Sequence, residues 1–337
     1  MKAFIKRILF VSVMLILLLT ASCRNDIEDK AYSADDFRIG IASGVSLIKL
    51  KNSIDVQESI ELSRDIVIDL NGNSLTFTGF IDLASSDIPY TVRIINGTIN
   101  ANKETQFFGV KVSKNSALIL EDIKLISDTS GIFISEGADN SSVSIIDSSV
   151  KALGSFGISA NSIYPVDNAD ILIRNSVIST EGASDGDNTA ILFDINGTVT
   201  IDISELIADR QTVVLRGGAG HSIRNSSIIV TGNNSKTANQ SYIDKNWGRG
   251  NEVPLAALVI GNRRDTGNFY PASAELSEVT INAPDKNNAD IDYHGIYVWQ
   301  NRTDYPVKVS GSVRFSDNDK TNTDNMNGAM YSVIKLQ

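Results

Sequence analysis

Short apolar stretches separated by polar residues run through the chain from about residue 54 to its C-terminus. Within a stretch the apolar residues occupy alternate positions, as Ile296 and Val298 do in the segment Gly295-Ile296-Tyr297-Val298-Trp299. Amphipathic helices instead carry apolar residues three and four positions apart. Ile and Val, which favour strands, supply many of the apolar positions. The pattern therefore predicts many short β-strands.

One corner recurs along these strands. Apolar strand residues lead into Asn or Asp at positions 71, 96, 122, 147 and 175, at steps of 25, 26, 25 and 28 residues, and again at 225. A second short strand follows the corner, and a loop of variable length leads to a third. The third strand often opens with Gly or Ala, as in 109–112, 131–134, 157–159, 257–260 and 295–298. Three short strands in about 25 residues predict a coil that winds once and stacks on the next.

The repeat resembles that of the right-handed parallel β-helix family, the pectate-lyase-like solenoids, over about residues 54–337. Two-residue hairpin turns, which join antiparallel strands, are mostly missing. The resemblance implies an all-β fold, a right-handed parallel β-helix solenoid of roughly nine coils with three short strands each. Each coil then contributes Ile, Val or Leu to a shared interior, where like residues stack about 4.8 Å apart.

The corners and the two ends of such a column make their own demands. Asn and Asp suit the corners because they tolerate left-handed backbone and bond to nearby main chain. Stacked Asn side chains can also form an amide ladder. The ends need covers, since unpaired strand edges recruit other strands. We expect residues 38–62 to cover the N-terminal end and the last strand, 331–334, to close the other, which gives a single domain over 38–337.

The first 22 residues have the pattern of a targeting signal. Lys2, Lys6 and Arg7 precede an apolar run over 8–19 that is too short for a membrane span. Small residues then lead to Cys23, the only cysteine, so that residues 1–22 resemble a bacterial lipoprotein signal peptide with Cys23 as the lipidated first residue of the mature chain. The alternative is ordinary secretion, with Cys23 removed or left as a free thiol.

Residues 23–37 are polar and acidic, and we expect them to tether the domain to the bilayer. Arg24 stands where an inner-membrane retention signal would have Asp. The expected location is therefore the outer membrane of a Gram-negative cell envelope. Exposure of the domain at the cell surface is compatible with this location. Removal of residues 1–22 takes away three basic residues and no acidic ones, which leaves 27 minus 40, a charge of −13.

Composition narrows the range of partners. The 337 residues are 42% apolar and carry a net charge of −10. No basic patch is visible, so no nucleic acid partner is expected. The run Gly217-Gly218-Ala219-Gly220 lacks the Gly-Lys-Ser/Thr ending of a phosphate loop, so no nucleotide is expected. One Cys and two His exclude a Cys- or His-based metal cluster. Calcium in the acidic loops 285–292 or 317–324 stays open, although their spacing fits no EF-hand.

Three long loops, 232–253, 262–273 and 284–293, fall late in the chain. Long loops on a rigid scaffold are usual places for binding residues. Both tryptophans and six of nine tyrosines also lie after residue 240. Alternation puts Tyr297 and Trp299 on the outer face, beside Val259 of the preceding coil. The sequence thus predicts a platform for stacking sugars whose ligand-binding residues are Trp247, Arg263, Arg264, Tyr270, Asp292, Tyr297 and Trp299. Alternatively, the loops fold back and bury these rings as a small second core.

Candidates for catalysis are fewer. β-helix hydrolases use clustered aspartates on stacked strands with a His-Gly, and only His294-Gly295 matches. Asp265 and Asp292 could act as the two carboxylates of an inverting hydrolase if their loops converge. His294 also fits a hydrogen-bonded residue at a coil edge, and His221 a turn. The leading hypothesis is a surface lipoprotein that binds glycan through its C-terminal half. The alternatives are a polysaccharide lyase or glycoside hydrolase, and a structural or adhesive surface protein.

Overall fold

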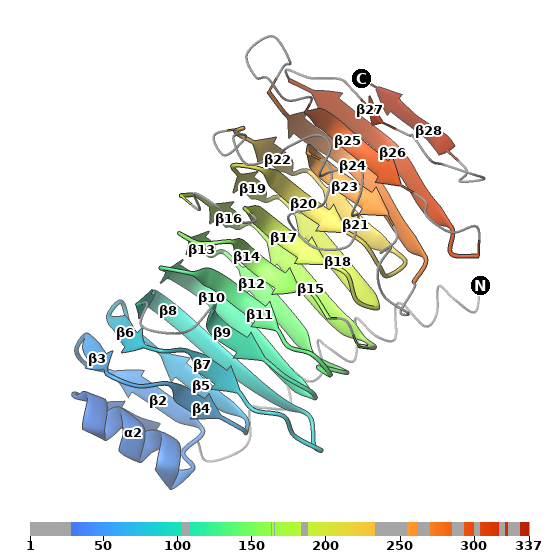
Figure 1. Ribbon diagram of the computed structural model, residues 1–337. Helices are drawn as coiled ribbons and strands as arrows, with labels where there is room; N and C mark the ends of the chain where they lie inside the picture. The colour runs from blue at the N-terminus through green and yellow to red at the C-terminus, as the bar shows by residue number, and fades with distance from the viewer. Residues whose placement is uncertain are drawn as a thin grey trace.

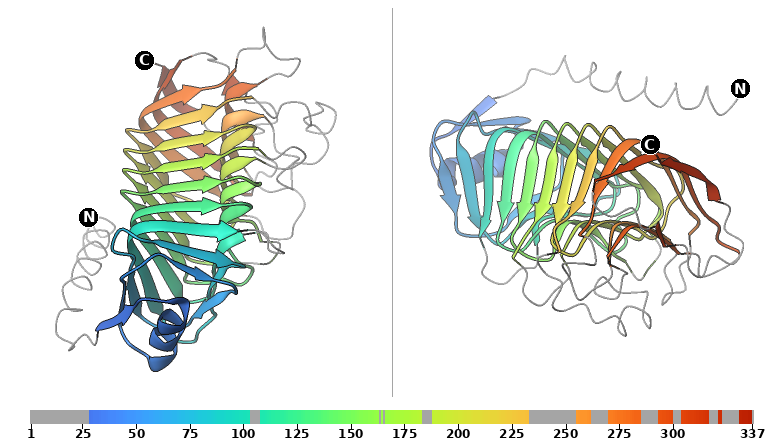
Figure 2. Two further views of the ribbon diagram at one scale, coloured as in Figure 1. Left: turned by 90° about the vertical axis from the view of Figure 1, so that its left-hand side faces the viewer. Right: turned by 90° about the horizontal axis from the view of Figure 1, so that it is seen from above.

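The computed structural model describes residues 28–102, 108–162, 164, 166–182, 188–232, 255–261, 270–284, 293–299, 304–316, 321–322 and 331–336. These residues form three columns of stacked strands (Figures 1 and 2). All strand pairs among them are parallel, and each crossover to the next strand of a column passes through the other two columns. Such crossovers are right-handed in nearly all proteins. The chain is a right-handed parallel β-helix.

The first two columns are joined into one sheet because four long strands run through both. The first column contains β1 (Glu28–Ala31), β2 (Leu47–Leu50), β5 (Ile66–Asp69), β8 (Tyr90–Asn102), β10 (Ser116–Ser127), β12 (Ser142–Ile146), β15 (Ala169–Arg174), β18 (Gly197–Asp202), β21 (His221–Arg224), β24 (Ala272–Asn282), β26 (Val307–Phe315) and β28 (Tyr331–Leu336). The second contains β3 (Ile54–Val56), β6 (Ser74–Thr78), β13 (Ser149–Ala152), β16 (Val177–Thr180), β19 (Glu205–Ala208) and β22 (Ser227–Val230), with the later parts of β8, β10, β24 and β26.

The third column is a separate ten-stranded sheet among the described residues. Its strands, in chain order, are β4 (Ile60–Leu62), β7 (Ile81–Leu83), β9 (Phe108–Val112), β11 (Ser130–Ile134), β14 (Phe156–Ala160), β17 (Thr189–Phe193), β20 (Gln211–Leu215), β23 (Ala256–Gly261), β25 (His294–Trp299) and β27 (Thr321–Asn322). The strands that the sequence expects to open with Gly or Ala all belong to this sheet.

Aliphatic residues fill the space between the columns in aligned stacks, as predicted. One stack in the first column runs in register through Ile68, Ile94, Leu120, Ile145 and Ile173, all fully buried. Each residue contacts its counterpart one coil away, and apolar burial of this kind supplies most of the stabilisation of the fold.

The predicted corners separate the first column from the second. Asn71, Asn96, Asp122, Asp147 and Asn175 all have left-handed backbone, with φ between 48° and 60°. The prediction of Asn and Asp at left-handed corners is confirmed. The amide ladder forms in part: the Asn175 side-chain N–H donates to the Asp147 carboxylate at 2.6 Å. At the opposite end of the first column, Asn115, Asn140 and Asn168 form a second amide ladder, which the sequence analysis did not anticipate.

A serine follows the corner in successive coils and bonds the coils together. The backbone N–H groups of Ser148, Ser176 and Ser204 donate to the hydroxyl oxygens of Ser176, Ser204 and Ser226 of the next coil, each at 3.1 Å. Each hydroxyl in turn donates to the carbonyl two residues earlier. The serines therefore satisfy main-chain groups at the bend, where the strand ladder is interrupted.

A helix that begins before residue 38 covers the N-terminal end of the column. Helix α2 (Ala34–Ser43) starts at the capping residue Ser33, whose hydroxyl accepts the Asp36 N–H, and buries Phe37 completely. Strand β1 pairs with β2. Residues 28–37 of the expected tether thus belong to the folded domain, because an amphipathic first turn with a buried Phe covers the column end. No described helix is long and apolar enough to cross a lipid bilayer.

Two described corner residues, Ile203 and Glu278, break the Asn/Asp rule, and Ile203 provides a test. Ile203 has φ of 51° and is 56% exposed. Left-handed backbone is unfavourable for a β-branched residue by about 1 kcal/mol. Ile203→Asn should therefore raise the free energy of unfolding by about 1 kcal/mol in urea titrations. Ile207→Asn, in the following strand, is the control and should lower it. A loss of stability in Ile203→Asn would contradict this account of the corner.

Candidate functional site

The outer face of the ten-stranded sheet carries two rows of side chains. In each strand from β9 to β25 two successive residues point inwards, and the residues before and after this pair point outwards. The first row of outward residues is Phe108, Ser130, Phe156, Thr189, Gln211, Ala256 and His294. The second is Asp82, Lys111, Phe133, Ser159, Leu192, Val214, Val259 and Tyr297. The predicted pairing of Val259 with Tyr297 is present.

The inward positions explain why small residues open these strands. A Cβ atom added to Gly131 would lie 2.5 Å from the carbonyl oxygen of Gly157, and one added to Gly157 would lie 2.6 Å from that of Ala190. Successive coils approach too closely there for a larger side chain. The small residues thus fix the spacing that aligns the two outer rows.

The middle of this face is aliphatic and buried. Leu192, Val214, Ala256 and Val259 form a cluster of their own, separate from the interior core, and each is at most 1% exposed. Phe156 and Tyr297 are half-buried and pack against this cluster. Strands β17, β20 and β23 are therefore buried on both faces.

Charged and polar side chains are buried beside this cluster. Arg216 donates to the Asp194 carboxylate at 2.7 Å, and neither side chain is exposed. The Ser162 backbone N–H donates to the other oxygen of Asp194 at 3.2 Å. In the first row the Thr189 hydroxyl donates to the buried Gln211 amide oxygen at 3.3 Å.

Such burial does not follow from the needs of the fold. Removing an ion pair from water costs several kcal/mol per ion, which close contact offsets only in part. Aliphatic residues at Asp194 and Arg216 would fill the same space, although the Ser162 N–H would then lose its present partner. A group of buried polar residues on one stretch of one sheet face is therefore the candidate functional site.

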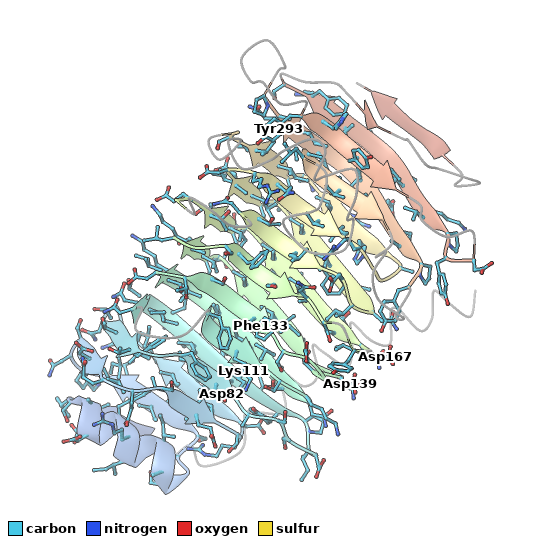
Figure 3. The ribbon with its side chains drawn as sticks, in the orientation of Figure 1. Asp82, Lys111, Phe133, Asp139, Asp167 and Tyr293 are labelled. Atoms are coloured by element: carbon cyan, nitrogen blue, oxygen red, sulfur yellow. The ribbon has the colours of Figure 1, made fainter. Side chains whose placement is uncertain are left out.

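Two tyrosines border this stretch, and both stay protonated at neutral pH. Burial raises the pKa of Tyr293 to about 12, against the opposing attraction of Arg210. Burial also raises the pKa of Tyr270, helped by the nearby carboxylates of Asp167, Asp139 and Asp194, although a backbone hydrogen bond from Val166 opposes the rise. Figure 3 shows Tyr293 near the C-terminal end and the two corner aspartates, Asp139 and Asp167, further down the solenoid.

The structure places only part of the predicted ligand platform. Tyr297 and His294 are half-buried neighbours, with ring centroids 5.3 Å apart in an edge-to-face arrangement. The backbone of Trp299 lies in β25 in register with Gly261. Tyr270 packs close to Gly217, further along the coil. The other predicted site residues lie outside the described residues: Cys23, Trp247, Arg263, Arg264, Asp265 and Asp292.

The sequence analysis missed Asp194, Arg216 and Gln211. A signal was present: the segments 190–193, 213–215 and 256–260 are uninterrupted apolar runs, whereas Lys111 and Ser159 interrupt the earlier strands at the equivalent position. Uninterrupted apolar strands are typical of sheets buried on both faces. Read in this way, the run would have placed Asp194 and Arg216 at the edge of a covered surface.

Within the described coils, the corner between the first two columns offers no comparable site. A shallow groove of about 600 Å³ runs along the corner, past Asn96, Asp122, Lys124, Asp147 and Asn175. It follows from the bend between the first two columns and lacks aromatic side chains. Among the described residues, no three His, Cys, Asp or Glu side chains are placed to hold a metal ion.

His221 is a structural residue rather than part of a turn. It opens β21 and is 1% exposed. Its Nδ1 accepts the Val199 backbone N–H at 2.9 Å, and its Nε2 lies 2.6 Å from the Gly217 carbonyl oxygen. Both contacts are satisfied by a neutral ring that carries its proton on Nε2. Burial lowers the pKa of His221 to about 4.

This depressed pKa predicts instability in acid. Below its ordinary pKa of 6.5, His221 takes up a proton in the unfolded chain before it does so in the folded one. The folded state should therefore lose about 3 kcal/mol as pH falls from 6.5 to 4. Urea titrations at pH 7, 5 and 4 measure this loss. His221→Gln should show a loss smaller by that amount, and equal losses in both proteins would contradict the assignment.

Comparisons with known proteins give similar folds only. An alginate lyase from Paenibacillus sp. str. FPU-7 is 12% identical, with 88% of this chain and 98% of that chain covered and a TM-score of 0.48. The protein L. reuters 100-23 SRRP is 15% identical, with 93% and 99% covered and the same TM-score. No family model matches the chain, and none of the curated proteins matches it. No residue role is transferred from either structure.

Proposed function

We propose that the protein binds glycan chains at the C-terminal part of the outer face of the ten-stranded sheet. The observation that carries this proposal is the half-buried pair of Tyr297 and His294 rings at the edge of the aliphatic cluster, with the fully buried Asp194, Arg216 and Gln211 as polar support behind the surface. Binding sites for small polar molecules combine apolar walls with a few fixed polar groups.

Tyr297 and Trp299 give this site its stacking surface in the proposal. Tyr297 is half-buried, so one side of its ring is held by the aliphatic cluster. Gly261 precedes Trp299 by one coil in the same register and adds no side chain next to it. A pyranose ring has an apolar face for an aromatic ring and a rim of hydroxyls for the Tyr297 hydroxyl and the His294 ring nitrogens. Trp247, Arg263, Arg264, Tyr270 and Asp292 join the site in the same proposal.

Binding is favoured over catalysis on the described residues. The hydrolase alternative depends on Asp265 and Asp292 with His294, and only His294 is described. Tyr270 and Tyr293 have raised pKa values and are poor general bases near neutral pH. Detection of an unsaturated or newly reducing chain end in the binding assays below would replace the binding role by an enzymatic one.

A lipid anchor at Cys23 completes the proposal. It would hold the protein at the outer membrane and present the solenoid to glycans of the envelope or surroundings. Helix α2 and β1 cover the N-terminal end of the column. The stacking surface on β25 is at the opposite end (Figure 1).

The anchor is tested by Cys23→Ser in the full-length chain, expressed in a Gram-negative host. The native chain should partition into the membrane fraction and incorporate radiolabelled palmitate. Cys23→Ser should do neither, because the thiol that accepts the lipid is gone. Tyr32→Ala, at an exposed position outside the signal, is the control and should be labelled. Membrane-free native protein without label would contradict the anchor.

The glycan site is tested by Tyr297→Ala and Trp299→Ala. Tyr32→Ala, at an exposed position at the N-terminal end of the column, is the control. A panel of soluble polysaccharides is run through affinity electrophoresis. Loss of either platform ring should weaken binding roughly tenfold or more, while Tyr32→Ala binds as the native protein does.

Thermal unfolding of the same variants separates binding from packing. If Tyr297→Ala and Trp299→Ala lower the unfolding midpoint and leave the affinity for every polysaccharide unchanged, the rings belong to a second small core and the proposal fails.

A further inference from the structure

A second group of aromatic side chains lies on the same sheet face, in the N-terminal half. Phe80 directly precedes β7, Phe108 opens β9 and Phe133 lies in β11, and all three are half-buried. The Phe108 and Phe133 rings are stacked, with centroids 5.1 Å apart and an interplanar angle of 23°. Phe80 meets Phe108 edge to face, also at 5.1 Å.

An ion pair lies directly beside the rings. The Lys111 ammonium nitrogen is 3.1 Å from one oxygen of Asp82 and 3.2 Å from the other. Both side chains keep contact with solvent, at 30% exposure for Lys111 and 20% for Asp82. Strand register places Asp82, Lys111 and Phe133 side by side in the second row, as Figure 3 shows.

These five residues, which we call the N-terminal aromatic patch, are rigidly placed. Adjacent strands fix the three positions of the second row about 4.8 Å apart. The small side chain of Ser130, in register with Phe108, leaves room for the Phe133 ring to lie over its neighbour. The patch does not depend on long loops for its geometry.

The patch has the chemistry of a pyranose-binding surface. Half-exposed phenyl rings offer a flat apolar area of about one ring, and their burial by a ligand is favourable. The Asp82 carboxylate accepts, and the Lys111 ammonium donates, charge-assisted hydrogen bonds to vicinal hydroxyls at the ring edge. A purely apolar partner would leave this ion pair desolvated and is disfavoured.

The charge of the protein favours neutral sugars over acidic ones as ligands of the patch. Lys111 is neutralised by Asp82, and Arg216 further along the face by Asp194. The chain as a whole carries a net charge of −10. A polymer of uronic acids would meet repulsion without an unpaired cation in the patch to offset it, whereas a neutral glycan meets none.

We infer that the N-terminal aromatic patch is a second carbohydrate site, which binds a neutral pyranose chain by stacking on Phe133 and Phe108 and by hydrogen bonds to Asp82 and Lys111. This inference deepens the proposed function by adding a site and a substrate class. The patch is separated from Tyr297 by the buried aliphatic cluster of β17, β20 and β23. The two sites therefore bind independently, and a long polymer that engages both gains avidity.

Six soluble polysaccharides serve as probes: neutral laminarin, mannan, xylan and galactan, and acidic alginate and polygalacturonate. Affinity electrophoresis and titration calorimetry are carried out on the native protein, Phe133→Leu, Phe133→Trp and Tyr297→Ala. Leu preserves apolar bulk and removes the ring, so Phe133→Leu should weaken binding of a neutral polymer roughly tenfold. Phe133→Trp should retain it. The affinity should not vary with ionic strength, because the ligand is uncharged.

The controls separate the two sites and the fold. Ile39→Ala, at an exposed position of α2, should change nothing. Phe133→Leu should unfold at the native midpoint, and Lys111→Met should weaken binding as Phe133→Leu does. Loss of binding in Tyr297→Ala with Phe133→Leu unchanged overturns this inference and keeps the proposed function. The opposite result keeps the inference and overturns the first site. Tighter binding of the acidic polymers, or no binding by the native protein, overturns the inference as well.

Discussion

The left-handed corner between the first and second columns is the constraint on which the rest of the molecule depends. At Asn96, Asp147 and Asn175 the chain turns from the first column into the second. The main-chain N–H and C=O groups at this turn must still find hydrogen-bond partners. Residues that tolerate positive φ make the bend possible. The serine hydroxyls that follow, such as that of Ser176, donate to the bent main chain and accept a backbone N–H of the preceding coil. Each coil thereby enters the second column in the register of the coil before it.

That register is what turns a sheet into a binding surface. Once the corners align the coils, the outward positions of the ten-stranded sheet form continuous rows, and chemistry can change along a row without disturbing the fold. The second row changes from the charged pair of Asp82 and Lys111 to Phe133, then to the aliphatic Leu192 and finally to Tyr297. Loops absorb differences in coil length, so the rows stay in place. Both carbohydrate sites that we propose use this property.

The buried polar residues lower the stability of the fold relative to aliphatic residues of the same size. Asp194 and Arg216 hold each other at 2.7 Å in a place without solvent, and their pairing offsets only part of the cost of desolvation. The interior core, in contrast, consists mainly of aliphatic residues with a few aromatic ones such as Phe77 and Phe193. Ser and Asn side chains at the corners bond main-chain groups that need partners. Polar groups that the fold does not require are therefore informative about function in this protein.

The sequence alone determined the architecture, because a β-helix is a local pattern repeated: strand period, Asn or Asp at the corner and small residues at the opening of the third strand are all short-range signals. It also placed Tyr297 next to Val259, since that contact follows from the repeat. Only the tertiary structure decided that α2 covers the N-terminal end, that Phe108 and Phe133 stack, and that Arg216 finds Asp194. These contacts join residues from different coils. They depend on the direction and the burial of each side chain, and the spacing of residues within one repeat determines neither.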